Sequence, residues 1–261
     1  MTWVIGLRSM FGYAAAISDV QVTWPSQGKT LDCLQKVYPI APFMVAGFAG
    51  SVRIGFGLLE DLYRWVNFQR HEEEAVNTRI VAHLWWRRAR RLFSMQRPEL
   101  RSLGAQVLLA GVSIGEREGD APWARSDVIS LRSSEGFKPR YAKGLEALSV
   151  GSGSEVEEYI EALGGLHELI QAEVFNPGGF GFGLAMRLSF ILRQHPRPGV
   201  SRHLILAIAR QGDLNLSIIN RTDFPPEGQP IEDPVPPIAR SWEEFKRLAS
   251  THGLEAPSAS A

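Results

Sequence analysis

Few residue types in this chain have the spacing that metal binding or catalysis requires. Cys33 is the single cysteine, which excludes an intramolecular disulfide and any multi-cysteine metal site. The six histidines are scattered without the spacing of metal ligands. We therefore predict that the chain binds no metal and no cofactor.

Two glycine-containing segments suggest nucleotide binding, and neither supports it. Gly28-Lys29-Thr30 has the end of a phosphate-binding loop, but the first glycine of that motif falls on Thr23. Residues 178–183 are rich in glycine, yet no strand precedes them. A flexible connection between helices is the favoured interpretation of that segment.

One predicted helix carries a basic cluster beside two tryptophans. Its members are Arg87, Arg88, Arg90, Arg91, Trp85 and Trp86. The cluster could contact nucleic acid or an acidic partner. However, the chain has 28 Lys and Arg against 28 Asp and Glu, and nucleic-acid binders usually carry a basic excess. A solvated face or a subunit contact is favoured, and we expect no nucleic-acid partner.

Length and composition are those of a globular protein. The 261 residues are 44% hydrophobic and 21% charged, which is enough for one large core and one or two domains. No stretch reaches the ~18 apolar residues of a membrane-spanning helix, so we expect no membrane partner. The apolar residues 10–17 make a poor signal peptide, and we expect a soluble, cytoplasmic protein.

Hydrophobic periodicity predicts strands, two helices, strands, two helices and strands again. The expected strands cover residues 3–8, 13–17, 33–40, 43–49, 106–112, 128–131, 145–150, 204–209 and 214–219, with a loop at 23–30. The expected helices cover about 54–66, 74–95, 154–175 and 183–193. This order predicts an α+β fold, a four-layer αββα sandwich in which two antiparallel sheets lie between helix pairs.

The chain divides by composition near residue 223. Residues 1–223 are predicted to form the domain, and residues 224–261 form a proline-rich extension. Ser241 to Glu244 form a capping box for a short helix that ends near Leu248. The last residues, 256–261, are expected to be disordered.

Four segments resemble the β subunits of the proteasome and the bacterial peptidase HslV, which are N-terminal nucleophile hydrolases. They are Thr-Trp-Val-Ile-Gly-Leu-Arg at 2–8, Ala-Ile-Ser-Asp at 16–19, Phe-Met-Val-Ala-Gly-Phe-Ala-Gly at 43–50 and Val-Gly-Ser-Gly-Ser at 150–154. Each is short, but their order and spacing agree with the family over roughly residues 2–220. The resemblance implies the αββα fold and self-assembly into a homo-oligomeric ring.

The resemblance also implies a set of site residues. Thr2, once Met1 is removed, would supply the hydroxyl nucleophile and use its own α-amine as the general base. Asp19 matches the acidic residue that holds the family's catalytic Lys, and Ser152 matches a serine near the nucleophile. Gly47 and Ala49 lie in the segment whose backbone N–H stabilises the oxyanion. The alternatives are that Thr2 is only a strand-favouring residue and that Asp19 only caps a turn.

The chain departs from the family at the position of the catalytic Lys. Counting back from Ala46-Gly47 without a gap places it on Cys33, and a neutral thiol cannot replace an ammonium. Lys36 falls on the opposite face of the expected strand, and Lys29 lies in the preceding loop. The Asp and Ser expected within 193–199 are also missing, and His195 is there instead.

Two functions follow from this mixed evidence. The first is a threonine-type peptidase that hydrolyses peptide bonds through Thr2 inside a ring, with an ATPase regulator as a possible partner. The second is a catalytically inactive ring or scaffold protein, favoured by Cys33 at the Lys position. An amidase acting on a small molecule is a minor third option.

Overall fold

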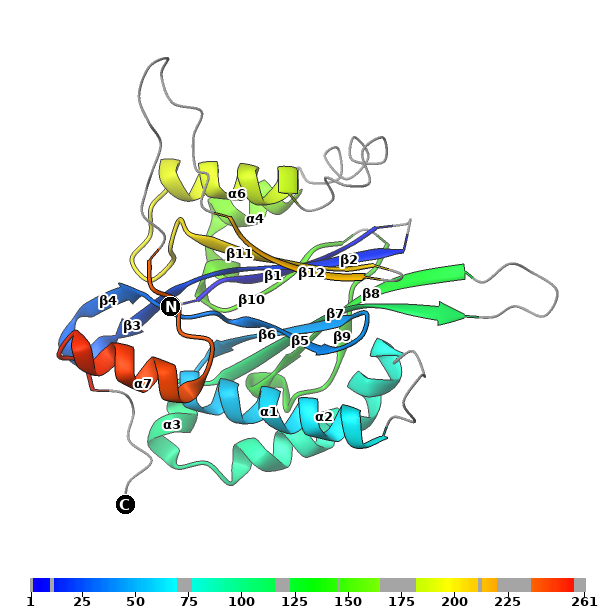
Figure 1. The fold of residues 1–261 in the computed structure, drawn as a ribbon, viewed down its shortest axis with the longest axis horizontal. Helices are drawn as coiled ribbons and strands as arrows, with labels where there is room; N and C mark the ends of the chain where they lie inside the picture. The colour runs from blue at the N-terminus through cyan, green and yellow to red at the C-terminus, as the bar shows by residue number, and fades with distance from the viewer. Residues whose placement is uncertain are drawn as a thin grey trace, which may run out of the picture.

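The computed structural model describes residues 2–9, 12–69, 77–115, 123–144, 146–164, 182–210, 213–219 and 236–255 (Figure 1). Their strands form two five-stranded sheets and one two-stranded sheet, and all the strand pairs are antiparallel. The first sheet has the order β10 (Leu148–Val150), β1 (Val4–Arg8), β2 (Tyr13–Asp19), β11 (Leu204–Arg210), β12 (Asp213–Ile219). The second has the order β5 (Val37–Ala41), β6 (Met44–Gly50), β7 (Ala105–Gly115), β8 (Trp123–Arg132), β9 (Arg140–Tyr141).

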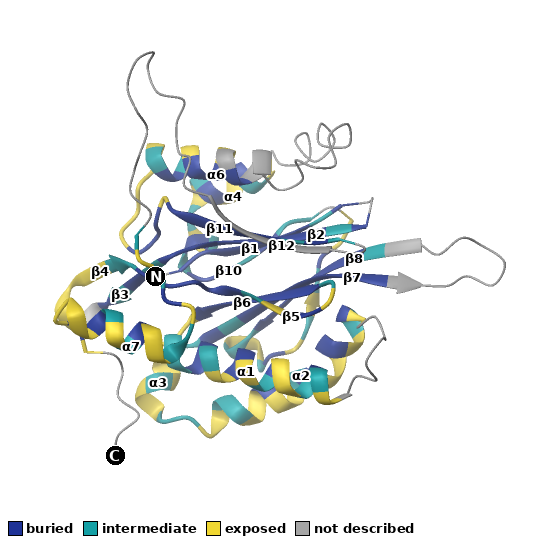
Figure 2. Cartoon of the chain, viewed as in Figure 1, coloured by how far each residue is buried: buried dark blue, intermediate teal, exposed yellow. Residues whose placement is uncertain are grey.

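The two larger sheets pack face to face through small and branched side chains. One buried cluster joins Val4, Ala14 and Ala16 of the first sheet to Val45 and Leu108 of the second. β1 therefore reads as a near-continuous apolar run, as expected of a strand that is covered on both faces. Figure 2 shows the buried strands in the interior and the exposed residues on the outer sides of the helices.

Helices cover the outer face of each large sheet (Figure 1). α1 (Val52–Gln69) and α2 (Thr78–Ser94) pack against the second sheet, and α4 (Glu157–Gly164) and α6 (Phe182–Gln194) pack on the first. Asn77 begins α2, because its side chain accepts hydrogen bonds from the first free N–H groups of that helix. Two further helices, α3 (Pro98–Ser102) and α7 (Trp242–Thr251), lie outside these pairs.

The predicted αββα sandwich of two sheets between helix pairs is wrong. The described residues form three sheets, and α3 and α7 belong to neither helix pair. The third sheet is a hairpin of β3 (Gln21–Trp24) and β4 (Lys29–Asp32), joined by the 3-10 turn Pro25–Gln27, where a loop was predicted. Periodicity missed it because its strands have four residues each and β4 is largely polar.

α7 packs on this hairpin and not at the end of a free extension. Trp24 stacks on Phe245 with ring centroids 5.7 Å apart, and the Trp24 Nε1–H donates to the carbonyl of Glu255. Ser241 caps α7 as predicted, by accepting from the Glu244 N–H. The division of the chain at residue 223 stays a prediction, since residues 220–235 lie outside the described part.

Other predicted features fall partly or wholly outside the described residues. These are the glycine-rich segment 178–183 except for its last two residues, the second half of the helix predicted at 154–175, and the tail 256–261. Within the described chain, no helix is long and apolar enough to cross a membrane.

Two glycines of α1 provide a test of how closely this helix approaches the second sheet. A Cβ at Gly55 would lie 2.1 Å from Phe48 Cδ2, whereas a Cβ at Gly57 would meet nothing within 4 Å. We predict that Gly55→Ala lowers the free energy of unfolding by about 1–3 kcal/mol through overpacking. Gly57→Ala should raise it by up to about 1 kcal/mol, because alanine favours the helix. Urea unfolding of both variants measures the difference, and equal effects would contradict this packing.

Candidate functional site

A buried ion pair lies where β1 begins and β2 ends. Lys36 Nζ is 3.0 Å from both carboxylate oxygens of Asp19 and also donates to the carbonyl of Gln21 at 2.5 Å. Asp19 is 0% exposed and Lys36 is 1% exposed. A charge buried this deeply persists only when it is paired and hydrogen-bonded, so each residue requires the other.

Backbone groups from three parts of the chain hold the Asp19 carboxylate. Oδ1 accepts from the N–H of Trp3 at 2.7 Å, and Oδ2 accepts from Gln21 at 2.9 Å and Ser201 at 3.4 Å. Asp19 is the last residue of β2, and its own N–H donates to the Trp3 carbonyl. These bonds fix the carboxylate beside the first residues of β1, directly after Thr2.

The charge state of Lys36 is set by two opposing effects. Burial lowers the pKa of Lys36, because the low-dielectric interior disfavours the ammonium form. The negative charge and the hydrogen bonds of Asp19 oppose this effect and favour the charged form. The site thus holds a lysine that is more easily deprotonated than a lysine in water, yet retains a carboxylate partner.

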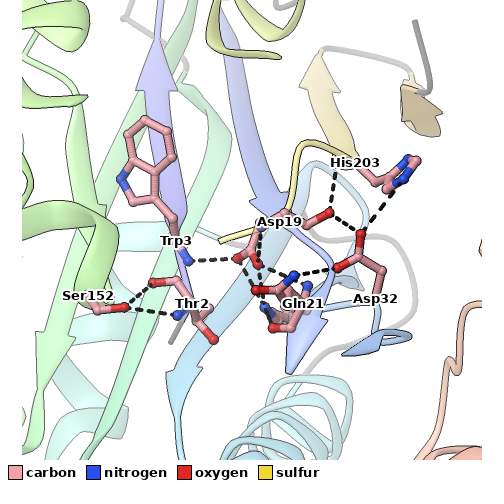
Figure 3. Close-up of polar contacts among 9 residues, drawn as sticks. Thr2, Trp3, Asp19, Gln21, Asp32, Ser152 and His203 are labelled. Atoms are coloured by element: carbon pink, nitrogen blue, oxygen red, sulfur yellow. Dashed lines mark hydrogen bonds and ion pairs between the residues drawn. The ribbon is translucent and has the colours of Figure 1, made fainter. Parts of the chain in front are cut away.

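Thr2 lies between Ser152 and the Asp19 network (Figure 3). The Thr2 nitrogen donates to Ser152 Oγ at 3.1 Å, and the same hydroxyl lies 3.4 Å from the Thr2 carbonyl oxygen. Gly151 permits this approach, since a Cβ there would lie 2.1 Å from that carbonyl oxygen, and its φ is +91°. The backbone conformation at Gly151 therefore places Ser152 against Thr2, two residues before β1 begins.

Gly47 and Ala49 of β6 lie beside these groups. A Cβ on Gly47 would meet Val4 Cγ1 at 2.7 Å and the Lys36 carbonyl oxygen at 3.3 Å. The Ala49 Cβ would lie 3.1 Å from a Cβ at Gly151. The structure therefore places all five residues that the sequence nominated in one region. Asp19 lies in the first large sheet, Gly47 and Ala49 in the second, and Thr2 and Ser152 in the segments next to β1 and β10.

Lys36 is the residue that sequence reasoning discarded. Cys33 and Lys36 were predicted to lie in one strand, where residues three apart face opposite sides. In the structure β4 ends at Asp32 and β5 begins at Val37, so the segment between them follows no strand alternation. The ungapped count back from Gly47 pointed to Cys33, whereas Lys36 is the residue that contacts the Asp19 carboxylate in the structure.

Cys33 is a buried thiol and takes no part in the ion pair. It is 0% exposed, and burial raises its pKa to about 12. Its backbone pairs on both sides, with the N–H donating to the Val20 carbonyl and the carbonyl accepting from Ala239. Cys33 is thus a packing residue of the core.

Ser201, two positions beyond the window of 193–199 in which a serine was expected, is a second residue at Asp19 that the sequence analysis did not name. Its N–H contacts Asp19, and its hydroxyl donates to Asp32 Oδ2 at 2.5 Å. Asp32 also accepts from the Gln21 side chain, and His203 Nε2 lies 3.7 Å from its Oδ2 (Figure 3). Through these contacts with Asp32, the side chains of Gln21, Ser201 and His203 connect the strand ends around Asp19.

His195 lies away from the ion pair. It is exposed, and its carbonyl accepts a hydrogen bond from the hydroxyl of Tyr159. Its neighbour Arg197 pairs with Glu158 of α4. The loop after α6 is therefore held to α4, and we assign His195 no part in the site.

No described group of three or more His, Cys, Asp or Glu side chains could hold a metal ion. The polar groups at the site are those of an acid–base centre: a threonine, a lysine, a carboxylate and two serines. No protein-family model matches this chain, and a search of curated proteins finds no match. The site must therefore be interpreted from its own geometry.

The Asp19–Lys36 pair predicts strong coupling between two substitutions. Lys36→Met leaves a buried carboxylate unpaired and Asp19→Asn leaves a buried ammonium unpaired, so each should cost about 3–5 kcal/mol of stability. The double variant buries neither charge and should cost clearly less than the sum of the two. Urea unfolding of all four proteins gives the coupling energy. Strictly additive effects would contradict the ion pair.

The burial of Cys33 predicts a protected thiol. With a pKa raised to about 12 by burial, Cys33 stays protonated at pH 8 and no reagent reaches it. We expect no reaction of the native protein with a disulfide reagent such as dithionitrobenzoate, and one equivalent of reaction in denaturant. Cys33→Ala, which has no thiol, is the control, and rapid labelling of the native protein would contradict the assigned burial.

Proposed function

We propose that this protein is an N-terminal nucleophile hydrolase that cleaves peptide bonds through Thr2 once Met1 has been removed. The buried Lys36–Asp19 pair is the observation that carries the proposal, because it supplies the lysine that the sequence had seemed to lack. The four segments that resemble proteasome β subunits and HslV support the same function.

The residues have separate roles in this mechanism. The Thr2 hydroxyl attacks the carbonyl carbon of the scissile amide, and its proton passes to the free α-amine of the same residue. Lys36 lowers the pKa of that amine by like-charge repulsion, so that more of it is unprotonated near pH 7. Asp19 holds Lys36 in place through both carboxylate oxygens.

The remaining groups orient the amine and stabilise the charged intermediate. Ser152 Oγ accepts a hydrogen bond from the Thr2 nitrogen and so orients the base. In this proposal a backbone N–H of the segment with Gly47 and Ala49 stabilises the oxyanion. The protonated amine then returns its proton to the leaving amine, and water hydrolyses the ester formed on Thr2.

Assembly and location complete the proposal. We expect a homo-oligomeric ring that encloses the sites, by the same resemblance, and an ATPase regulator remains a possible partner. The compartment we propose is the cytoplasm, where initiator methionine is removed from residues as small as Thr.

The test begins with the intact mass of the purified protein, which should lack the methionine residue. The protein should then form a covalent adduct with a peptide epoxyketone and hydrolyse fluorogenic peptides. Thr2→Ala should abolish both activities, and Thr2→Ser should retain a measurable rate. Removal of Met1 without any adduct or hydrolysis would refute the peptidase and favour the inactive ring or scaffold protein.

Lys36 provides a second test, with a matched control. Lys36→Met should lower the hydrolysis rate at least about 10²-fold, because the amine loses the cation that tunes it. Lys29→Met changes an exposed lysine of β4 and should leave the rate unchanged. Circular dichroism of both variants at the assay temperature establishes that they are folded. A folded Lys36→Met protein with the parental rate would exclude Lys36 from the mechanism.

A further inference from the structure

A pocket of about 640 Å³ lies over α1, and it shares no residue with the Thr2 site. Its walls come from β5, from the outer side of α1, from the end of α2 and from the start of α7. Tyr38, Ile40, Phe56 and Trp242 give it an aromatic and apolar lining. Its volume falls within the roughly 300–1,000 Å³ of small-molecule sites, which have the same kind of lining.

The aromatic side chains of this lining pack on one another. Phe56 contacts Tyr38 with ring centroids 5.9 Å apart and Trp242 with centroids 6.2 Å apart. Gly57 leaves the adjacent turn of α1 open, because a Cβ there would meet nothing within 4 Å. The packed aromatic rings and the open turn of α1 therefore form a preformed apolar surface, which suits the aromatic or branched apolar part of a ligand.

Two arginines and two acidic residues line the pocket, and they differ in their partners. Its two acidic residues already have cationic partners, since Glu60 pairs with Arg64 at 2.5 Å and Glu243 pairs with Lys246 at 2.6 Å. Its two arginines, Arg53 and Arg240, pair with no carboxylate in the described part of the chain.

Arg53 is held at the aromatic wall. Its Cζ lies 5.0 Å from the centroid of the Trp242 ring, which packs one face of the guanidinium against an apolar surface. An arginine stacked in this way still presents its N–H donors in the plane of the guanidinium, in a geometry that matches a carboxylate. The Glu244 carboxylate accepts from the Arg240 backbone N–H as part of the α7 cap, and within the described residues it forms no ion pair with Arg53.

We propose that this pocket binds a small organic anion with an aromatic or branched apolar body and one carboxylate or sulfonate group. The apolar body lies against Tyr38, Phe56 and Trp242, and the anionic group accepts from the guanidinium N–H groups of Arg53 and Arg240. This assignment is independent of the hydrolase chemistry at Thr2.

Anilinonaphthalene sulfonate is the probe, because it joins an aromatic body to one anionic group and fluoresces strongly in apolar surroundings. The full-length protein should bind one equivalent with micromolar affinity. The double variant Arg53→Gln/Arg240→Gln should bind it at least tenfold more weakly. The uncharged analogue N-phenylnaphthylamine should bind this variant and the parent equally, within about twofold.

Two further variants distinguish this pocket from other surfaces. Gly57→Leu fills the open turn of α1 and should abolish binding of both probes. Arg87→Gln removes an exposed arginine of α2, which stacks on Trp86 and does not line the pocket, and should change neither affinity. Thermal unfolding of each variant confirms that it is folded. The proposal would be overturned if Gly57→Leu still bound anilinonaphthalene sulfonate, or if the Arg53 and Arg240 substitutions left its affinity unchanged.

Discussion

The candidate site depends on one buried interaction, the ion pair between Asp19 and Lys36. Removing two charges from water costs several kcal/mol for each ion, and this pair offsets the cost through hydrogen bonds as well as mutual attraction. The Asp19 carboxylate accepts backbone N–H groups of Trp3, Gln21 and Ser201. Because Trp3 and Ser201 precede β1 and β11 and Gln21 begins β3, the pair also sets how these strand ends meet around Thr2.

The position of Lys36 depends in turn on a segment that belongs to no large sheet. Leu34 and Cys33 donate to the carbonyl of Val20, and Gln35 donates to the carbonyl of Ala239. Ala239 also forms the parallel bridge to Leu34, so the chain just before α7 supports the backbone that leads to Lys36. A residue close to the end of the chain thus contributes to a site built around its second residue.

On the other side of Thr2, a close approach of the backbone at Gly151 positions Ser152. Gly151 adopts a φ of +91° and lies where any side chain would meet the Thr2 carbonyl. Ser152 is placed by that backbone, and its hydroxyl then reaches the Thr2 nitrogen. The same glycine lies next to Ala49, so the first strand, the β6 segment and the turn after β10 meet within van der Waals distance.

The sequence by itself determined most strands and helices, because long apolar runs and helical spacing report local conformation directly. The resemblance of four short segments to a known family also nominated Thr2, Asp19, Ser152, Gly47 and Ala49. The sequence did not reveal the β3–β4 hairpin, the place of α7 or the short helix α3, and the fold class inferred from element order was wrong. Only the tertiary structure decided that Lys36 and Ser201, rather than Cys33 and His195, face Asp19. The reason is physical: the direction of a side chain in an irregular segment follows from distant contacts, here with Val20 and Ala239, and not from the period of its own strand.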